Sequence, residues 1–233
     1  MAIDGKNNHI ISDSLQGKPC IFQQLCPNDT VLVKAPKGRT IFSRDQYVTF
    51  IDHLHEGVVG VINTTKDGHE ILSALILPNQ FIGVAGFVNM YDSYSTVHLA
   101  EARALTAVTY CRVKREAVWE LMEVRSARSI IVNSICSMIY NMSTMTSNPL
   151  KHDVETRILR VLGVLIRGIG KPVRNGWVSI FGITHADIAT MANTTRPTAN
   201  RILNRMRKDG VIEIHRRNMD ISIARSKSLF ENI

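Results

Sequence analysis

Two arginines and an asparagine in the last fifth of the chain, Arg196, Asn200 and Arg201, have side chains suited to hydrogen bonding with DNA bases. A guanidinium group can form two hydrogen bonds to the major-groove edge of guanine, and a carboxamide can pair with adenine or contact a phosphate. Threonine hydroxyl groups near by are expected close to the DNA backbone. The predicted DNA-contacting set is Thr184, His185, Thr195, Arg196, Pro197, Thr198, Asn200, Arg201, Arg216 and Arg217.

Two short helices are predicted to position this set. Thr184 and Asp187 have the spacing of a capping box, in which the hydroxyl group caps an unpaired N–H and the carboxylate lies at the positive end of the helix dipole. Ile188 and Met191 then provide the apolar face of the first helix. Asn193 falls in the turn that follows, where a residue that tolerates a left-handed backbone is needed.

The second helix is predicted to begin after Thr195, whose hydroxyl group can cap it. Pro197 lies in its first turn, where no intrahelical hydrogen bond is lost. Four apolar residues fall on one side and four polar residues on the other, namely Ala199, Ile202, Leu203 and Met206 against Arg196, Asn200, Arg201 and Asn204. Because one face can pack in a core while the other contacts DNA, the two helices have the pattern of a helix-turn-helix.

A β-hairpin with a basic turn is predicted after Asp209-Gly210, which ends the second helix. Residues 211–215 and 221–224 alternate as strands, and the turn between them contains Arg216 and Arg217. Paired arginines beside a DNA-contacting helix suit phosphate contact, which adds affinity without sequence information. The alternative is an ordinary solvent-exposed hairpin turn.

The positive charge of the chain is concentrated in the same region. Residues 1–150 contain 13 basic and 13 acidic residues, whereas residues 151–233 contain 15 and 7, which accounts for the whole net charge of +8. A basic domain joined to a neutral one is typical of a polyanion-binding module with a separate control module. The length of 233 residues, with 45% hydrophobic and 21% charged, predicts two modest globular domains.

No apolar run approaches the length of a membrane span, and the first residues lack the features of a signal peptide. We therefore expect a cytoplasmic location and no membrane partner.

Short strands are predicted for residues 30–112. Turn signals recur along this region, at Pro36-Lys37-Gly38, His55-Glu56-Gly57, Lys66-Asp67-Gly68, Leu77-Pro78-Asn79 and 89–93. This spacing indicates an antiparallel barrel or sandwich. Asp67-Gly68, between the apolar segments 58–62 and 70–75, gives the clearest hairpin prediction.

A long helix is predicted from Lys114 to about Thr146, because apolar residues recur there at intervals of three and four. Its part from 129 to 145 has almost no charge, and we expect it to form an interface between two copies of the chain, with packing inside one chain as the alternative. The predicted interface residues are Ile131, Ile135, Met138, Ile139 and Met142. Ser147-Asn148-Pro149 is expected to form a hinge before a further helix at 153–167.

In this order, the barrel, long helix, hinge and basic helix-turn-helix resemble the catabolite-activator and fumarate-nitrate-regulator (CRP/FNR) family of bacterial transcription factors. The segments that carry the resemblance are Lys37-Gly38, Glu56-Gly57-Val58-Val59, Asp67-Gly68-His69-Glu70, Phe81-Ile82-Gly83 and, above all, Thr195-Arg196-Pro197-Thr198-Ala199-Asn200-Arg201. The resemblance implies an α+β fold with a cyclic-nucleotide-binding-like β-roll (a jelly-roll barrel), a long dimerisation helix and a C-terminal winged helix-turn-helix.

The same resemblance assigns residues to domains. It implies an N-terminal arm (1–29), an effector-binding-like β-roll (30–112), the dimerisation helix and hinge (113–148) and the DNA-binding domain (149–233). It also places Arg196 and Arg201 at the family's two DNA-facing arginine positions. Pro197 replaces a glutamate with which several members contact a base, so we expect a different preferred half-site.

The resemblance further implies an effector pocket in the β-roll, lined by Phe81, Gly83, Val84, Thr96 and Val97. Family members that bind cyclic nucleotides have a glutamate shortly after Phe-Gly for the ribose and an arginine-serine pair for the cyclic phosphate. Here Gly83 is followed by Val84-Ala85-Gly86, and Thr96 and Val97 take the positions of that pair. A cyclic phosphate would have no counter-charge. We therefore expect an effector other than cyclic AMP, or activity without one.

Four cysteines, Cys20, Cys26, Cys111 and Cys136, raise the question of an iron-sulfur cluster, because the fumarate-nitrate branch of the family has one. That branch uses three closely spaced N-terminal cysteines and one from the barrel. This chain has only two before the barrel, and Cys111 aligns two residues past the barrel cysteine. We therefore predict no metal site and no cofactor, with a redox-active thiol as an alternative and no structural disulfide.

Histidines offer a second alternative. His53 and His55 point to the same side of a predicted strand, and His69 and His98 are expected near them, so a haem or metal sensor is conceivable. Ordinary histidines of the barrel are the simpler interpretation.

We interpret the sequence as that of a homodimeric, sequence-specific transcription regulator whose second helices enter major grooves about one helical turn apart. The expected partners are double-stranded DNA, a second copy of the chain and an unidentified small-molecule effector, with RNA polymerase as a candidate. The rival interpretation is an enzyme or small-molecule-binding protein in which the helical pair serves only for packing. The sequence shows no nucleophile-base-acid set, metal-ligand spacing or phosphate-binding glycine loop, so we predict that the protein is not an enzyme.

Overall fold

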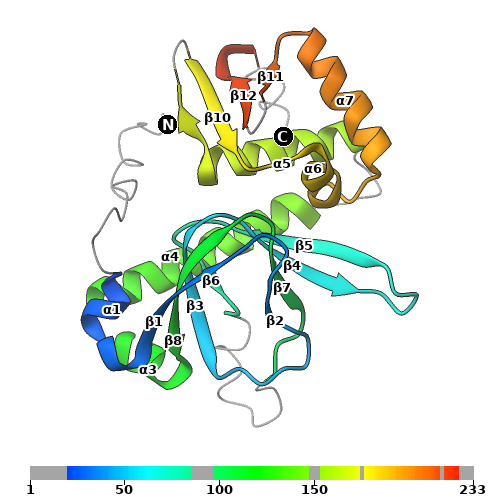
Figure 1. The fold of residues 1–233 in the computed structure, drawn as a ribbon. Coiled ribbons are helices and arrows are strands. Elements are labelled where there is room, and N and C mark those ends of the chain that lie inside the picture. Colours follow the sequence, from blue (N-terminus) through cyan, green and yellow to red (C-terminus); the bar gives the residue numbers. More distant parts are fainter. Residues whose placement is uncertain (1–19, 85–96, 147–152, 174–175, 216–217, 226–233) are drawn as a thin grey trace.

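The computed structural model describes residues 20–84, 97–146, 153–173, 176–215 and 218–225. These residues form two lobes, a strand-rich lobe from the N-terminal half and a second lobe from residue 153 onward (Figure 1). None of the described helices is long and apolar enough to cross a membrane.

The N-terminal lobe contains two four-stranded antiparallel sheets, with strand orders β1-β8-β3-β6 and β2-β7-β4-β5. The strands are β1 (Thr30–Ala35), β2 (Thr40–Phe42), β3 (Phe50–Glu56), β4 (Val59–Thr64), β5 (Glu70–Ile76), β6 (Phe81–Ile82), β7 (Glu101–Ala104) and β8 (Val108–Lys114). One core cluster takes residues from both sheets, among them Leu54, Tyr110, Val59 and Ala102. The predicted antiparallel barrel or sandwich is confirmed.

The hairpin predicted at Asp67-Gly68 joins β4 to β5. Gly68 adopts a φ of 80°, which favours glycine, and its N–H donates a 3.0 Å hydrogen bond to the carbonyl of Thr65. The strands then pair in the register Thr64↔Glu70 to Val59↔Ile76.

Helices pack on the outer face of the sheet that contains β3 and β8, and the longest of them also packs against β5 of the other sheet. They are α1 (Ile21–Leu25), the 3-10 helix η1 (Pro27–Asp29), α3 (Arg115–Leu121) and α4 (Arg125–Thr146). The single helix predicted from Lys114 is wrong, because the chain turns at residues 122–124 between α3 and α4. Val118 and Leu121 before the turn and Ala127 and Ile131 after it bury in one cluster. A single straight helix could not place both pairs of side chains in this cluster.

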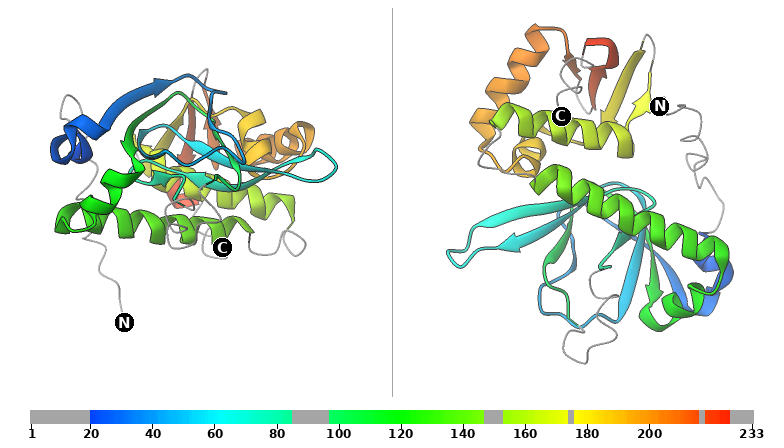
Figure 2. Two further views of the ribbon diagram at one scale, coloured as in Figure 1. Left: turned by 90° about the horizontal axis from the view of Figure 1, so that it is seen from below. Right: turned by 180° about the vertical axis from the view of Figure 1, so that it is seen from behind.

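α4 runs along the N-terminal lobe and ends beneath α5 (Figure 2). One side of α4 is buried in its own chain, where Ile131 is only 2% exposed and Ile135 and Met138 pack against the same cluster. Ile131 has no surface left for a partner and is corrected to a core residue. Ile139 and Met142, with exposures of 58% and 37%, remain accessible.

In the part that the structure describes, the C-terminal lobe combines the helices α5, α6 and α7 with a small sheet of order β11-β12-β10-β9. Its elements are α5 (Val154–Ile169), β9 (Lys171–Pro172), β10 (Trp177–Phe181), α6 (His185–Met191), α7 (Arg196–Lys208), β11 (Ile212–Ile214) and β12 (Asn218–Ser222). α5 lies close to the helix expected at 153–167, and the carboxylate of Asp153 caps it by accepting a 2.8 Å hydrogen bond from the N–H of Thr156. Strands β9 and β10 were not predicted.

The turn between β11 and β12 is shorter than predicted. Asn218, Met219 and Asp220 belong to β12, in which Met219 and Asp220 pair with Ile214 and Glu213, and the second strand ends at Ser222. The predicted placement of these three residues in the turn is therefore wrong. β12 starts early because it also pairs with β10 along its whole length, from Phe181↔Asn218 to Trp177↔Ser222.

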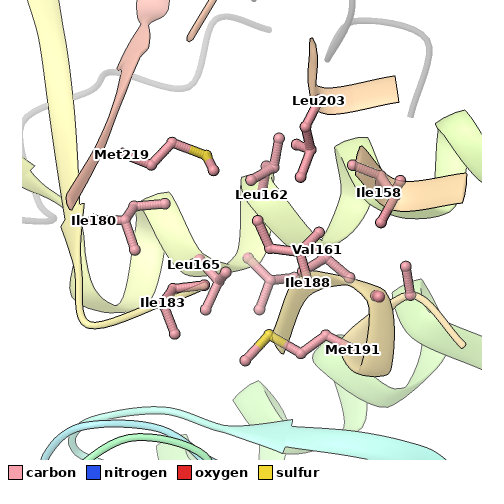
Figure 3. Packing of buried hydrophobic residues seen from close by; sticks show 14 of the residues in the cluster. Ile158, Val161, Leu162, Leu165, Ile180, Ile183, Ile188, Met191, Leu203 and Met219 are labelled. Atoms are coloured by element: carbon pink, nitrogen blue, oxygen red, sulfur yellow. The ribbon is translucent and has the colours of Figure 1, made fainter. Parts of the chain in front are cut away.

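The core of the C-terminal lobe is centred on α5. Figure 3 shows Ile158, Leu162 and Leu165 of this helix facing Ile188 of α6, Leu203 of α7, and Ile180 and Met219 of the sheet. Val58, Leu72, Leu75, Leu77 and Leu105 of the N-terminal lobe belong to the same apolar cluster. The two lobes therefore share a continuous core.

Candidate nucleic-acid interface

The first helix of the predicted helix-turn-helix begins as the sequence indicated. The hydroxyl group of Thr184 accepts a hydrogen bond from the N–H of Asp187 at 3.2 Å, and Asp187 Oδ2 accepts one from the N–H of Thr184 at 2.7 Å. This reciprocal pair satisfies two N–H groups that the first turn of α6 leaves without helical partners. Ile188 and Met191 are buried, as predicted.

The turn between α6 and α7 depends on Asn193. Its φ of 47° lies in the left-handed region that asparagine tolerates better than most residues. Arg157 of α5 supports the turn from below, because its Nε donates a 2.9 Å hydrogen bond to the carbonyl of Ala192. The turn is thus fixed to the central helix of the lobe.

α7 presents two chemically different faces. The hydroxyl group of Thr195 caps its start, with Pro197 in the first turn. Ala199, Ile202, Leu203 and Met206 are all at most 3% exposed, and Arg196, Arg201 and Asn204 are exposed on the other side. The predicted division of the helix into a packing face and a polar face is confirmed.

His185 and Asn200 are brought together across the two helices. The imidazole Nδ1 and the carboxamide Oδ1 lie 2.8 Å apart, and since the carboxamide oxygen can only accept, Nδ1 carries the hydrogen. The amide NH₂ of Asn200 stays available to an outside acceptor. His185 therefore orients Asn200, a relation that sequence spacing alone did not reveal.

Some other basic residues of this lobe contact acidic residues of the same chain. Arg205 of α7 forms an ion pair with Glu155 of α5, so it ties the two helices together. Arg216 and Arg217 lie outside the described residues. At the end of β11, His215 lies 3.2 Å from the carboxylate of Asp220.

The helix-turn-helix also contacts the N-terminal lobe. Lys37, in the loop after β1, donates a 2.6 Å hydrogen bond to Oδ2 of Asp187, although the two residues are 150 positions apart. The carboxamide of Asn193 accepts from the N–H of Leu72 and donates to its carbonyl, both at 3.1 Å. It thereby satisfies two backbone groups on the free edge of β5. Sequence reasoning gave Asp187 and Asn193 only local roles.

The predicted effector pocket is described only in part, because residues 85–96 lie outside the described residues. Phe81 and Val84 are 1% and 4% exposed and belong to the core beneath α1, so they offer a ligand no surface and are corrected to packing residues. Gly83 faces His98, Val97 pairs with Tyr47, and Thr96 lies outside the described residues. A hollow among the described residues is lined instead by Lys34, Ala35, Pro36, Glu56, Ala107, Val108 and Thr109.

Comparison with known protein families matches both lobes. Residues 32–125 match the cyclic nucleotide-binding domain, and residues 156–230 match the Crp-like helix-turn-helix domain. The chain belongs to the CRP/FNR family of transcription regulators. Members of this family are DNA-binding regulators and not enzymes.

Characterised relatives cover most of this CRP/FNR chain. The global nitrogen regulator of Synechococcus elongatus is 26% identical over 186 residues, which are 79% of this chain and 82% of the relative. The cyclic AMP receptor protein of Thermus thermophilus is 21% identical over 215 residues, covering 86% of this chain and 90% of the relative.

Solved structures agree with this CRP/FNR fold. A CRP-family transcriptional regulator from Thermus thermophilus superposes with a TM-score of 0.64 at 19% identity, covering 80% of this chain and 90% of that one. The c-di-GMP responsive global regulator of Xanthomonas campestris gives a TM-score of 0.63 at 16% identity, covering 83% and 94%. The predicted α+β architecture is confirmed.

Proposed function

We propose that this CRP/FNR regulator acts as a homodimer that binds a near-palindromic DNA duplex, with α7 of each chain in a major groove. The observation that carries the proposal is the exposed face of α7. Arg196 and Arg201 stand there without an ion pair to any described residue, whereas Arg205 on the same helix is paired with Glu155. Unpaired guanidinium groups can hydrogen bond to guanine at little cost, because no internal contact must break.

The dimer surface that we propose is the exposed side of α4. Ser129, Val132, Cys136, Ile139 and Ser143 recur there at intervals of three and four, and Val132 and Ile139 are 44% and 58% exposed. This spacing gives one straight stripe along a helix that packs against a second copy. Small residues alternate with apolar ones, which allows two helices to approach closely.

We further propose that the domains follow the predicted limits, with the β-roll at 30–112 as the effector-binding module and the chain located in the cytoplasm. The effector is expected to differ from cyclic AMP, since no arginine-serine pair is present at Thr96 and Val97 to hold a cyclic phosphate. RNA polymerase remains a proposed partner to which no residue is assigned.

Mobility shifts on promoter fragments, in the presence and absence of cyclic AMP, test this function. Arg196→Ala and Arg201→Ala should each weaken specific binding by about 1–3 kcal/mol, roughly 5- to 150-fold, while non-specific binding changes little. Lys171→Ala removes the same charge from an exposed strand away from α7 and should bind like the parent. Cyclic AMP should leave the affinity unchanged.

Parent-like binding by both arginine variants would show that α7 does not contact the bases. A large increase in affinity with cyclic AMP would contradict the proposed effector class.

A further inference from the structure

Two cysteines and two histidines meet under α1, on the outer face of the sheet that contains β3 and β8. His53 on β3 and Cys111 on β8 are paired neighbours in the register, and His55 lies at the register shift between Leu54 and Glu56, with its ring edge-on to that of His53. Cys20 stands directly before α1 and closes the group from above. His69 and His98, which were predicted near these histidines, lie elsewhere, because His98 stacks on Phe42 and His69 lies in the β4-β5 turn.

The distances in this group suit a metal ion. The sulfur atoms of Cys20 and Cys111 and a ring nitrogen of His55 all lie within 4.8 Å of one another. In a tetrahedral zinc site, Zn–S bonds of about 2.3 Å and Zn–N bonds of about 2.0 Å place the ligand atoms roughly 3.3–3.8 Å apart. Side-chain rotations that close the group by about an ångström would therefore complete three bonds.

His53 is the candidate for a fourth ligand, although its ring nitrogens are not among the ligand atoms that all lie within 4.8 Å of one another. Its ring centroid lies 4.8 Å from that of His55, and the residue is 4% exposed. Both ring nitrogens of His53 and both of His55 are buried with no hydrogen-bond partner among the described residues. A buried polar group without a partner is costly, and each imidazole can bind an ion through one of its nitrogens, so the two rings offer two ligand atoms.

A thiolate is the form of cysteine that binds metals, and a cation between the sulfurs of Cys20 and Cys111 would allow both to ionise. We propose that Cys20, Cys111, His55 and His53 form a mononuclear site for a zinc-class transition-metal ion. Two soft sulfurs and two imidazole nitrogens are the ligand set of a closed, four-coordinate zinc site. The proposal concerns the N-terminal lobe and does not depend on DNA binding.

The arrangement of the other cysteines argues against an iron-sulfur cluster. Cys26 lies outside the group, and its thiol contacts the carbonyl of Phe22 at 3.0 Å and the hydroxyl group of Thr30 at 3.2 Å. Cys136 is exposed on α4. A four-iron cluster takes four cysteine thiolates, and the group under α1 offers two.

Metal binding here would fix Cys20 and α1 against the sheet on which α4 also packs. Cys20 and Cys111 belong to the apolar cluster that also holds Phe22 of α1 and Ala127 and Ile131 of α4. A bound ion would tie α1 to β3 and β8, and through this cluster it would constrain where α4 lies. The site therefore couples metal availability to the element proposed to form the dimer.

Zinc and cobalt titration of the tag-free, full-length protein tests the proposal. After reduction and chelator treatment under anaerobic conditions, each chain should take up one Zn²⁺, measured by elemental analysis after dialysis. Co²⁺ should give the visible bands of a tetrahedral ion and a sulfur-to-metal charge-transfer band, and Zn²⁺ should abolish both.

Substitutions identify the ligands. Cys20→Ser, Cys111→Ser and His55→Gln should each lower Zn²⁺ affinity at least about 10-fold and remove or shift the Co²⁺ bands. Cys26→Ser and Cys136→Ser are the matched controls and should keep both the stoichiometry and the spectrum. Far-ultraviolet circular dichroism checks that each variant is folded, and His55→Gln is the least disruptive because His55 is only half-buried.

Three results would overturn the proposal. They are failure of the reduced parent protein to retain zinc, unchanged cobalt bands in folded Cys20→Ser or His55→Gln, and iron with an equal amount of sulfide in anaerobically purified protein. The first of these results is decided by the zinc content of the parent protein alone, without any variant.

Discussion

Asn193 shows how one side chain can serve two distant parts of the molecule. Its backbone adopts the left-handed conformation that the turn between α6 and α7 requires, and its carboxamide pairs with both backbone groups of Leu72 on β5. Glycine could supply the first property but not the second. Asparagine therefore meets both requirements at this position, the left-handed backbone of the turn and the hydrogen bonds to Leu72.

Two substitutions of Asn193 should separate the effect of its backbone conformation from that of its hydrogen bonds to Leu72. Asn193→Gly keeps the backbone conformation and loses two hydrogen bonds, which should reduce the free energy of unfolding by about 1–3 kcal/mol. Asn193→Ala loses the same bonds and adds the strain of a positive φ, so we expect a further loss of roughly 1 kcal/mol. Urea denaturation measures both. A parent-like Asn193→Ala would show that Leu72 does not depend on this carboxamide.

His98 gives the protein a predictable response to acid. Burial, and to a lesser degree the charge of Arg112, lower its pKa from 6.5 to about 4, and the ring stacks on Phe42 at a centroid distance of 3.5 Å. Between pH 6.5 and 4 the unfolded chain therefore binds a proton at this residue that the folded chain does not. Stability should fall as the pH is lowered through this window.

His98→Phe retains an aromatic ring and cannot titrate. Thermal unfolding between pH 7 and 4 should show a shallower loss of stability in this variant than in the parent, with His69→Phe in the exposed turn as the control. Identical pH profiles for all three proteins would contradict the assigned role of His98.

At the scale of elements, α4 satisfies two sets of contacts on different sides. Ala127, Ile131 and Ser134 are buried against the β-roll, and the N–H of Phe81 donates a hydrogen bond to the hydroxyl group of Ser134. Val132 and Ile139 remain exposed. Both the within-chain packing and the proposed dimer interface are thus accommodated by one helix, with different residues for each.

A charge on the exposed stripe should prevent dimer formation. Ile139→Glu would place a carboxylate where the proposed interface excludes water, and burial of an unpaired charge costs several kcal/mol. We expect a monomer by analytical ultracentrifugation at concentrations where the parent is a dimer. Ser137→Glu adds the same charge to an exposed position on a different side of α4 and should remain dimeric. A dimeric Ile139→Glu would place the interface elsewhere.

At the scale of the whole molecule, the lobes are joined by packing as well as by hydrogen bonds. Gly168 of α5 has no side chain, and Leu77 of the β-roll fills that space, since a Cβ on Gly168 would lie 2.5 Å from Leu77 Cδ1. The Lys37–Asp187 ion pair and the Asn193–Leu72 hydrogen bonds lie along the same junction. The position of α7 is therefore set partly by the β-roll.

The shared core predicts cooperative unfolding, which the two tryptophans can report. Trp119 lies in α3 and Trp177 in β10, so Trp177→Phe and Trp119→Phe each leave one probe in one lobe. The two fluorescence transitions in urea should coincide. Adding Leu77→Ala, a buried truncation that costs about 2–5 kcal/mol, should separate them. Transitions that stay coincident after this truncation would show that Leu77 does not couple the lobes.

The sequence by itself determined the elements whose signals are local. Thr184 and Asp187, Thr195 and Pro197, and the Asp67-Gly68 turn act through neighbours within a few residues, and periodicity along α7 distinguishes its two faces. These signals were sufficient for the strand-rich lobe and the helix-turn-helix, whereas the family was predicted from a resemblance. The turn at 122–124 was missed because periodicity reports which residues are apolar and not the direction in which a core lies.

Only the tertiary structure decided which residues meet across long stretches of chain. Contacts such as Lys37 with Asp187, Asn193 with Leu72, and Cys20 with His55 and Cys111 depend on how sheets and helices pack, which spacing does not encode. For the same reason, Ile131, Phe81 and Val84 were predicted on binding surfaces, but the structure buries them in the core. Apolar residues of a core and of a binding surface recur with the same spacing in the sequence. Their burial, which distinguishes the two, is defined only in the folded chain.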